Sequence, residues 1–159
     1  MELSTFLTFL IGKEYFAVNV TKVLEVLQHQ NITLIPKTPQ HILGIINFRG
    51  EILPVVDTKL KFNLKDDGEE SKIIIVFEIE NDGTKSIIAA TADSVKDVIE
   101  ISETEIKPVP EMGIRYNSNF LSGAIRRNEN FILLLNVEKI FSTTDLAEIT
   151  QLEHTIPTI

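Results

Sequence analysis

The feature that most constrains the fold of this chain is a similarity between its two halves. A shift of 72 positions places 16-FAVNVTKVLEVL-27 over 88-IAATADSVKDVI-99, and a shift of 79 places 44-GIINFRGEILPVVDTKLKF-62 over 123-GAIRRNENFILLLNVEKIF-141. Apolar and polar residues stay in step along both alignments. Self-similarity at a constant spacing is the signature of a repeated structural unit. The sequence therefore predicts a duplicated unit of about 75 residues and two similar lobes.

Each half consists of short apolar runs separated by turn residues. Such runs indicate β-strands, and the Asn-Asp-Gly sequence at 81–83 is a strong hairpin signal. Short strands joined by turns favour a barrel or a sandwich over a parallel sheet. Half of the chain has room for about five strands. The predicted hairpins pair Phe6–Ile11 with Tyr15–Val18, Gly44–Phe48 with Ile52–Val56, Lys72–Glu80 with Lys85–Ala90, and Leu121–Arg126 with Phe131–Asn136.

Helical signals are few and short. Asn19–Glu25 has room for one or two turns, and Pro39–Ile42 has a proline suited to a first helical turn. Ser102–Glu105 matches a capping box. From Thr144 onward, apolar residues recur on one face, which predicts an amphipathic helix.

The predicted fold class is all-β, with two five-stranded lobes, short helices and a C-terminal helix. A chain of 159 residues buries roughly 70% of its unfolded surface, so a core forms without disulfides; there is no cysteine. The expected organisation is one two-lobed domain over 1–145, with repeat cores at 16–62 and 88–141, and a C-terminal amphipathic helix or tail over 146–159.

The charge balance of the chain argues against several partners. The formal net charge is −8 and the sequence pI is about 4.9. Phosphate backbones and anionic lipids require clustered Lys and Arg, so we expect no nucleic acid and no direct membrane insertion. The apolar runs are too short to span a bilayer, and the first residues lack the features of a secretory signal. A cytoplasmic location is therefore expected.

The sequence also lacks the residue patterns of catalysis. Its three histidines, His29, His41 and His154, show no metal-ligand spacing, and no serine lies in a Gly-x-Ser-x-Gly elbow. No phosphate-cradling glycine motif occurs. We therefore expect no enzyme, no metal and no cofactor. A protein that binds a small ligand or a sugar between its lobes remains the alternative from another class.

The copies differ most at one turn, where the first has Asn47-Phe48-Arg49-Gly50 and the second Arg126-Arg127-Asn128-Glu129. The surrounding 44-GIINFRGEILPVVD-57 closely resembles the signature of CheW-type chemotaxis coupling proteins, Asn-x-Arg-Gly-x-x-x-Pro-Val-x-Asp. The likeness extends from Phe6 to Phe141. One departure is Thr58, where the family usually has leucine.

This resemblance implies a fold of two five-stranded SH3-like barrels. It also implies a cytoplasmic, non-enzymatic adaptor that links methyl-accepting chemotaxis receptors to the regulatory domain of the histidine kinase CheA. Such an adaptor regulates kinase activity within receptor arrays, in swimming chemotaxis or in a related pathway such as surface motility. We expect the kinase contacts to be apolar residues at the barrel ends, but the sequence identifies none of them.

The resemblance further implies a receptor-binding groove between the lobes, lined by Val23, Glu25, Asn47, Arg49 and Val98. An arginine fork suits a carboxylate or backbone carbonyls of a receptor helix, and Glu25 is placed to hold it. Val23 and Val98 would form the apolar floor of the groove. The alternative for Arg49 is that its side chain only covers apolar surface of the hairpin, and for Glu25 that it only lies on the solvent face of a strand. The alternatives for the others are that both valines belong to the core and that Asn47 only bonds the turn backbone.

Four further signature residues are predicted to serve the backbone. Gly44 and Gly50 permit a positive φ or a close approach of chains. Pro54 is expected at a strand edge or a bulge. Asp57 is expected to cap the short segment that follows it, Thr58–Phe62.

Overall fold

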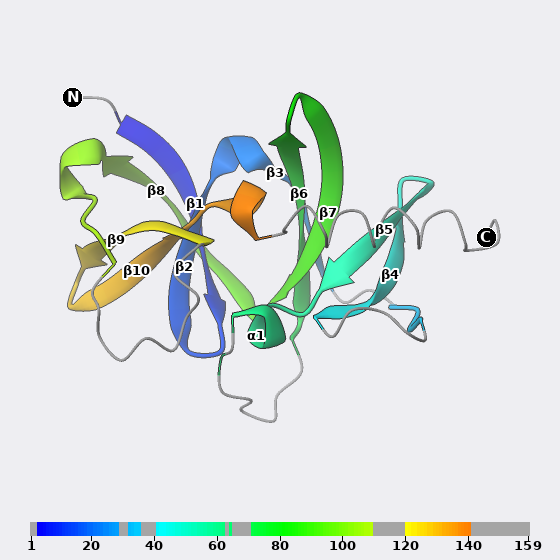
Figure 1. Ribbon diagram of the computed structural model, residues 1–159. Helices are drawn as coiled ribbons and strands as arrows, with labels where there is room; N and C mark the ends of the chain where they lie inside the picture. Colours follow the sequence, from blue (N-terminus) through cyan, green and yellow to red (C-terminus); the bar gives the residue numbers. More distant parts are fainter. Residues whose placement is uncertain are drawn as a thin grey trace.

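The structure, a computed structural model, describes residues 3–28, 32–35, 41–62, 64, 71–109 and 120–140. These residues form two five-stranded sheets that lie beside each other (Figure 1). The first sheet has the strand order β8-β1-β2-β10-β9, and the second has the order β3-β6-β7-β5-β4. We call them the first barrel and the second barrel. The predicted all-β class with two five-stranded lobes is confirmed.

The strands are β1 (Leu3–Ile11), β2 (Glu14–Asn19), β3 (Val23–Gln28), β4 (Ile42–Phe48), β5 (Glu51–Val56), β6 (Ile73–Asn81), β7 (Thr84–Ala92), β8 (Ser94–Ser102), β9 (Leu121–Arg127) and β10 (Asn130–Leu135). Short helices are η1 (Val20–Lys22), α1 (Thr58–Lys61), η2 (Glu103–Glu105) and η4 (Val137–Lys139). All four predicted hairpins form as antiparallel pairs.

Each barrel contains strands from both copies of the repeat. The opening hairpin β1–β2 pairs with β8 and β10, and the equivalent hairpin β6–β7 pairs with β3 and β5. The chain therefore passes from the first barrel to the second between β2 and β3, and returns between β7 and β8. The two lobes are thus not the two repeats themselves, because the copies exchange their opening hairpins.

Both barrels close through the segment that follows an outer strand. Thr33, after β3, exchanges two backbone hydrogen bonds of 2.9 Å with Ile45 of β4, and Lys107, after β8, does the same with Ala124 of β9. A Cβ atom at Gly44 would lie 2.3 Å from Thr33 O. The predicted close approach at Gly44 is confirmed, and it explains why a glycine recurs at this place in both copies.

The apolar interior has three parts. One buried cluster lies within each barrel. A third, larger cluster draws residues from both barrels. Its aromatic rings follow one another with centroid distances of 6.2 Å (Phe9 to Phe16), 5.5 Å (Phe16 to Phe62) and 5.1 Å (Phe62 to Phe120). We call this third cluster the common core, because it joins the barrels by apolar packing.

The short helical predictions have mixed outcomes. The Ser102 capping box is confirmed, and Asp57 Oδ1 accepts a hydrogen bond from Leu60 N at 3.3 Å, as a cap of α1 should. The helical prediction for Asn19–Glu25 is wrong beyond Lys22, since Val23 begins β3, which is held by its pairing with β6. Ile42 begins β4. His41 lies in a turn, so the part of the Pro39–Ile42 prediction that is described is wrong. Pro39, Gln40 and the C-terminal helix fall outside the described residues.

Pro54 does not lie on an outer strand, because β5 is placed between β7 and β4. It pairs with Ile45, one pair away from the register shift between Ile42 and Gly44. The ladder between β5 and β7 begins only at Val55. The edge prediction is therefore wrong for the sheet as a whole, and the missing N–H of Pro54 is tolerated where pairing to β7 has not yet begun.

Candidate protein-binding site at the β4–β5 hairpin

The β4–β5 hairpin turns through Arg49 and Gly50, which both have positive φ values, of 51° and 82°. Positive φ at both central residues is the geometry of the two-residue turn that matches strand twist. No described atom lies within 4 Å of a Cβ built at Gly50, so the glycine serves the backbone conformation, not a close contact. Asn47 Oδ1 accepts a hydrogen bond from Gly50 N at 3.1 Å, which confirms its turn-bonding role.

The turn presents the Arg49 guanidinium to solvent. Its carbon atom lies 4.8 Å from the ring centroid of the buried Phe48, a cation–π distance. Its Nη2 donates to Glu25 Oε2 at 3.2 Å, and the arginine side chain is still 69% exposed. The predicted pairing of Glu25 with Arg49 is thus present, with most of the fork free for another acceptor.

The Glu25–Arg49 pair joins the two sides of the second barrel at which its outer strands lie. Glu25 belongs to β3 and Arg49 to the β4–β5 turn, and β3 and β4 are the two outer strands of the same sheet. An exposed ion pair of this kind contributes about 0–1 kcal/mol to stability. Its structural effect is therefore to orient the guanidinium, and it adds little to the stability of the barrel.

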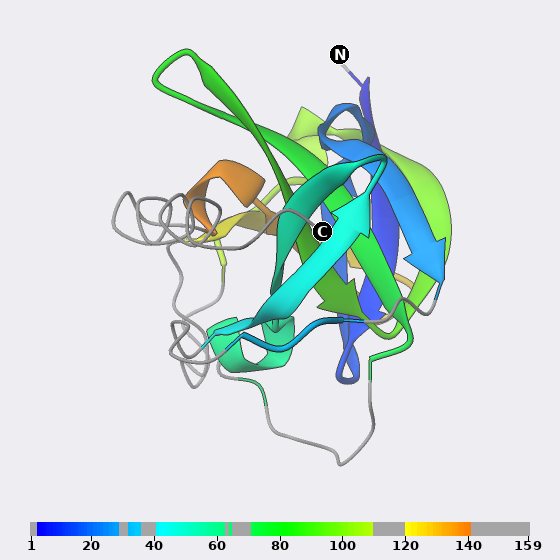
Figure 2. The ribbon, with the colours of Figure 1, turned by 90° about the vertical axis from the view of Figure 1, so that its right-hand side faces the viewer.

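The two valines of the predicted groove differ in environment. Val23 is half-buried and packs against the common core, which favours the core alternative. Val98 is 62% exposed and lies on β8 of the first barrel, opposite Leu7. Figure 2 shows β3 and β8, the outer strands of the two sheets, on its right-hand side. A single groove that contains all five residues remains a prediction.

Sequence reasoning missed two apolar residues on the outward face of β3. Leu24 and Val26 flank Glu25 and are exposed, whereas Val23 and Leu27 are half-buried. The signal was available, because Val26 aligns with Val98 under the shift of 72. Two equivalent exposed valines therefore lie on the outer strands of the two barrels.

The equivalent hairpin of the first barrel has two arginines at the end of β9. Arg126 is exposed, with its guanidinium carbon 6.0 Å from the ring centroid of Phe131, whereas Arg127 is bound within the barrel. Arg127 donates from Nε and Nη2 to the two carboxylate oxygens of Glu105, both at 3.0 Å, and from Nη2 to Glu100 O at 2.8 Å. The hydrogen bond from Arg127 holds the pKa of the Glu105 carboxyl below its ordinary value, with help from the Ser102 N–H. This second arginine is engaged within its own barrel.

Two further observations concern metal binding and membrane-spanning helices. Among the described residues, no group of three or more His, Asp or Glu is arranged to hold a metal ion. None of the helices in the described ranges is long and apolar enough to cross a membrane. The fold and the hairpin together define the class: a duplicated, two-barrel β protein that presents an exposed ion pair.

The chain belongs to the CheW-like family, whose domain matches residues 5–145. It is 30% identical over 143 residues to the chemotaxis protein CheW of Klebsiella aerogenes, covering 89% of this chain and 84% of that protein. It is 32% identical over 139 residues to CheW of Helicobacter pylori, covering 87% and 82%. The crystal structure of the scaffolding protein TtCheW from Thermoanaerobacter tengcongensis superposes with a TM-score of 0.78 at 30% identity, covering 91% and 92%.

Another relative bears a different name. The protein FrzA of Myxococcus xanthus is 32% identical to this chain over 144 residues, which is 87% of this chain and 85% of that protein. The relatives of this chain therefore include a protein with a name other than CheW.

Proposed function

We propose that this chain is a non-enzymatic, cytoplasmic chemotaxis adaptor that couples methyl-accepting receptors to the regulatory domain of the histidine kinase CheA and so regulates kinase activity within receptor arrays. Membership of the CheW-like family supports the adaptor class. The observation that carries the proposal for the site is the exposed Arg49 fork, steered by Glu25 and stacked on Phe48.

Each residue of the proposed receptor site has a different role. Asn47 and Gly50 fix the turn, Glu25 orients the guanidinium, and the guanidinium binds a carboxylate or backbone carbonyls at the receptor tip. Val98 supplies exposed apolar surface. Val23 supports β3 from beneath through its contact with the common core.

A receptor that covers Arg49 would change its energetics. In water the Glu25–Arg49 attraction is screened, but exclusion of solvent strengthens hydrogen bonds to a charged group. Arginines at the centre of an interface are among the common hot spots. The same side chain therefore contributes little to the free protein and much to a complex.

The experiment measures binding of the whole chain to a receptor-tip fragment. Arg49→Ala is expected to weaken binding by about 2 kcal/mol, because it removes a hot-spot contact. Lys85→Ala is the matched control, since Lys85 is an exposed cation on β7 of the same barrel. Unchanged receptor binding by a folded Arg49→Ala protein would refute the site.

A second assay tests the partners themselves. Co-purification of the chain with a CheA regulatory domain and a receptor tip should give a ternary complex. If the chain co-purifies with the CheA regulatory domain but not with the receptor tip, the adaptor class stands and the receptor assignment is refuted. The small-ligand alternative is disfavoured, because in the described residues aromatic rings of the common core pack between the barrels.

A further inference from the structure

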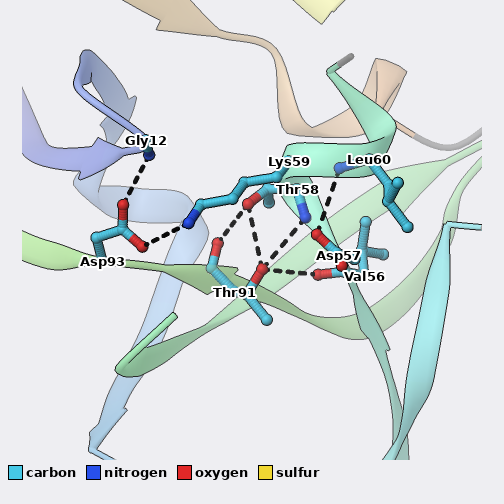
Figure 3. A network of polar contacts seen from close by, with 8 residues as sticks. All are labelled: Gly12, Val56, Asp57, Thr58, Lys59, Leu60, Thr91 and Asp93. Atoms are coloured by element: carbon cyan, nitrogen blue, oxygen red, sulfur yellow. Dashed lines mark hydrogen bonds and ion pairs between the residues drawn. The ribbon is translucent and has the colours of Figure 1, made fainter. Parts of the chain in front are cut away.

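A polar network joins the two barrels at the place where β7 ends and β8 begins (Figure 3). Asp93 is the one residue between these strands, which belong to different barrels. Its backbone N–H donates to Leu10 O at 2.8 Å, and its carboxylate Oδ2 accepts from Gly12 N at 2.7 Å. Leu10 belongs to β1 and Gly12 to the β1–β2 turn, so both hydrogen bonds hold Asp93 to the first barrel.

The other carboxylate oxygen faces the second barrel. Lys59 Nζ lies 3.6 Å from Asp93 Oδ1, and Lys59 belongs to α1, which directly follows β5. The Lys59 side chain is only 11% exposed and that of Asp93 26%. No described residue donates a hydrogen bond to the enclosed Oδ1 atom. The Lys59 ammonium group is therefore the counter-charge of that oxygen, in a setting where water screens the attraction poorly.

Helix α1 is itself fastened to β7. Thr58 N donates to Thr91 Oγ1 at 3.2 Å, and Thr58 Oγ1 donates to Thr91 O at 2.7 Å. Both threonines are buried. The base of Lys59 is thus held by the second barrel while its ammonium group reaches the carboxylate held by the first (Figure 3).

The other crossing between the barrels carries an ion pair of opposite polarity. Lys22, at the end of η1 between β2 and β3, pairs with Glu138 of η4, the short helix after β10. Glu138 aligns with Lys59 under the shift of 79. Lys22 aligns with Ser94, the neighbour of Asp93, so a charge pair lies at each crossing although only one of its two positions is matched between the copies. A side chain that merely filled space would not require this complementarity.

We propose that Asp93 and Lys59 form an inter-barrel latch that fixes the orientation of the two barrels. The common core alone is suited to holding the barrels together but not to fixing their angle, because apolar packing is non-directional. Packed elements slide past one another in small steps when only such contacts join them. A carboxylate shared by a turn of one barrel and a helix of the other opposes that sliding.

The absence of cysteine from the chain makes the orientation measurable. Single cysteines at Lys96 of β8 and Glu51 of β5, both exposed positions, carry spin labels for a pulsed-EPR distance between the barrels. We expect one narrow distance distribution with the latch intact. Lys59→Met should broaden or shift this distribution, and Lys59→Arg should restore it.

The control breaks an ion pair that does not join the barrels. Lys85→Met removes the contact with Glu78 within the β6–β7 hairpin and should leave the distance distribution unchanged. A folded Lys59→Met protein with the unaltered narrow distribution would overturn the latch.

Amide hydrogen exchange distinguishes two roles of Asp93: fixing the orientation of the barrels, and only stabilising the β1–β2 turn. Asp93→Ala removes the acceptor of Gly12 N and should accelerate exchange of that amide about tenfold, as well as broaden the distance distribution. Lys59→Met should broaden the distribution and leave Gly12 exchange close to its original rate. If Asp93→Ala does not fold, Lys59→Met still decides the question. Fast Gly12 exchange with an unchanged inter-barrel distance would assign Asp93 to the turn alone and contradict the proposal.

Discussion

The β4–β5 and β9–β10 hairpins occupy equivalent places in the two barrels. Arg49 is a turn residue of the β4–β5 hairpin, whereas Arg126 and Arg127 are the last two residues of β9 and align with Asn47 and Phe48. Arg127 places its donors on a carboxylate and a backbone carbonyl of the first barrel. Arg49 makes one hydrogen bond of 3.2 Å to Glu25 and keeps most of its surface in solvent. The duplicated fold does not by itself require this difference, which supports the proposal that Arg49 contacts another molecule.

The largest expected difference between the copies concerns the glycines at the barrel closures. An alanine Cβ at Gly44 would lie 2.3 Å from a backbone oxygen, which cannot move without breaking the closure. At Gly123 the nearest atom, 2.6 Å away, is the Cγ2 methyl of Ile106, Lys107 O follows at 3.0 Å, and φ is 159°. Gly44→Ala should therefore cost about 3 kcal/mol and Gly123→Ala, whose backbone oxygen neighbour is farther away, about 2 kcal/mol.

Denaturant unfolding of the two alanine variants measures this difference directly. An equal decrease in the free energy of unfolding for the two variants would show that both barrel closures accommodate the added methyl group at the same cost. The closures would then be equivalent, and the copies would differ only at their turns.

The next comparison concerns acid stability, because the β9–β10 hairpin ties Arg127 to a carboxylate, that of Glu105, whose pKa is lowered. The folded state favours ionised Glu105. The stabilisation is therefore complete above the ordinary pKa of 4.5 and is lost as the pH falls through the lowered value. Wild type should thus exceed Glu105→Gln in melting temperature at neutral pH, and the gap should narrow in acid.

Glu25→Gln is the matched control for this measurement, since it neutralises the partner of Arg49. Its melting temperature should remain close to that of wild type over the same pH range, because the exposed pair contributes little. A gap for Glu105→Gln that stays constant with pH would contradict the assignment of the lowered pKa to Arg127.

The comparison of the two copies also shows which features of the fold could be predicted from the sequence. Alternating apolar runs and the Asn-Asp-Gly turn predicted all four hairpins, because strand alternation and turn chemistry are local properties. The alignment of the copies predicted two lobes but not the exchange of opening hairpins. Which hairpin pairs with which outer strand depends on contacts between residues far apart in the chain, and these leave no local pattern.

The candidate site could likewise be predicted only in its local features. The turn residues Asn47 and Gly50 and the pairing of Glu25 with Arg49 followed from motif and charge. The burial of Val23 did not, because a valine in a strand faces inward or outward according to register. The inter-barrel position of Asp93 also gave no sequence signal, since it depends on the crossing between sheets.

A smaller difference lies in the second turn residue. Gly50 has φ 82°, whereas the aligned Glu129 has φ 71° and carries a side chain in a conformation that costs about 1 kcal/mol. Glu129→Gly gives the turn the Asn-Gly sequence that this geometry prefers, and should stabilise the protein by about 1 kcal/mol. Gly50→Ala should destabilise it by a similar amount. Denaturant midpoints check both, and a destabilised Glu129→Gly would show that the Glu129 side chain makes a contact of its own.

The smallest expected effect is the most informative for function. Arg49→Ala should change the free energy of unfolding by less than about 0.5 kcal/mol, because the exposed pair with Glu25 is well screened. Arg127→Ala should cost clearly more, because it removes bonds to Glu105 and to Glu100 O. Denaturant unfolding of both variants at one pH gives the comparison. A large loss for Arg49→Ala would mean that this arginine, like Arg127, stabilises its own barrel. Weaker receptor binding by that variant would then no longer indicate direct contact.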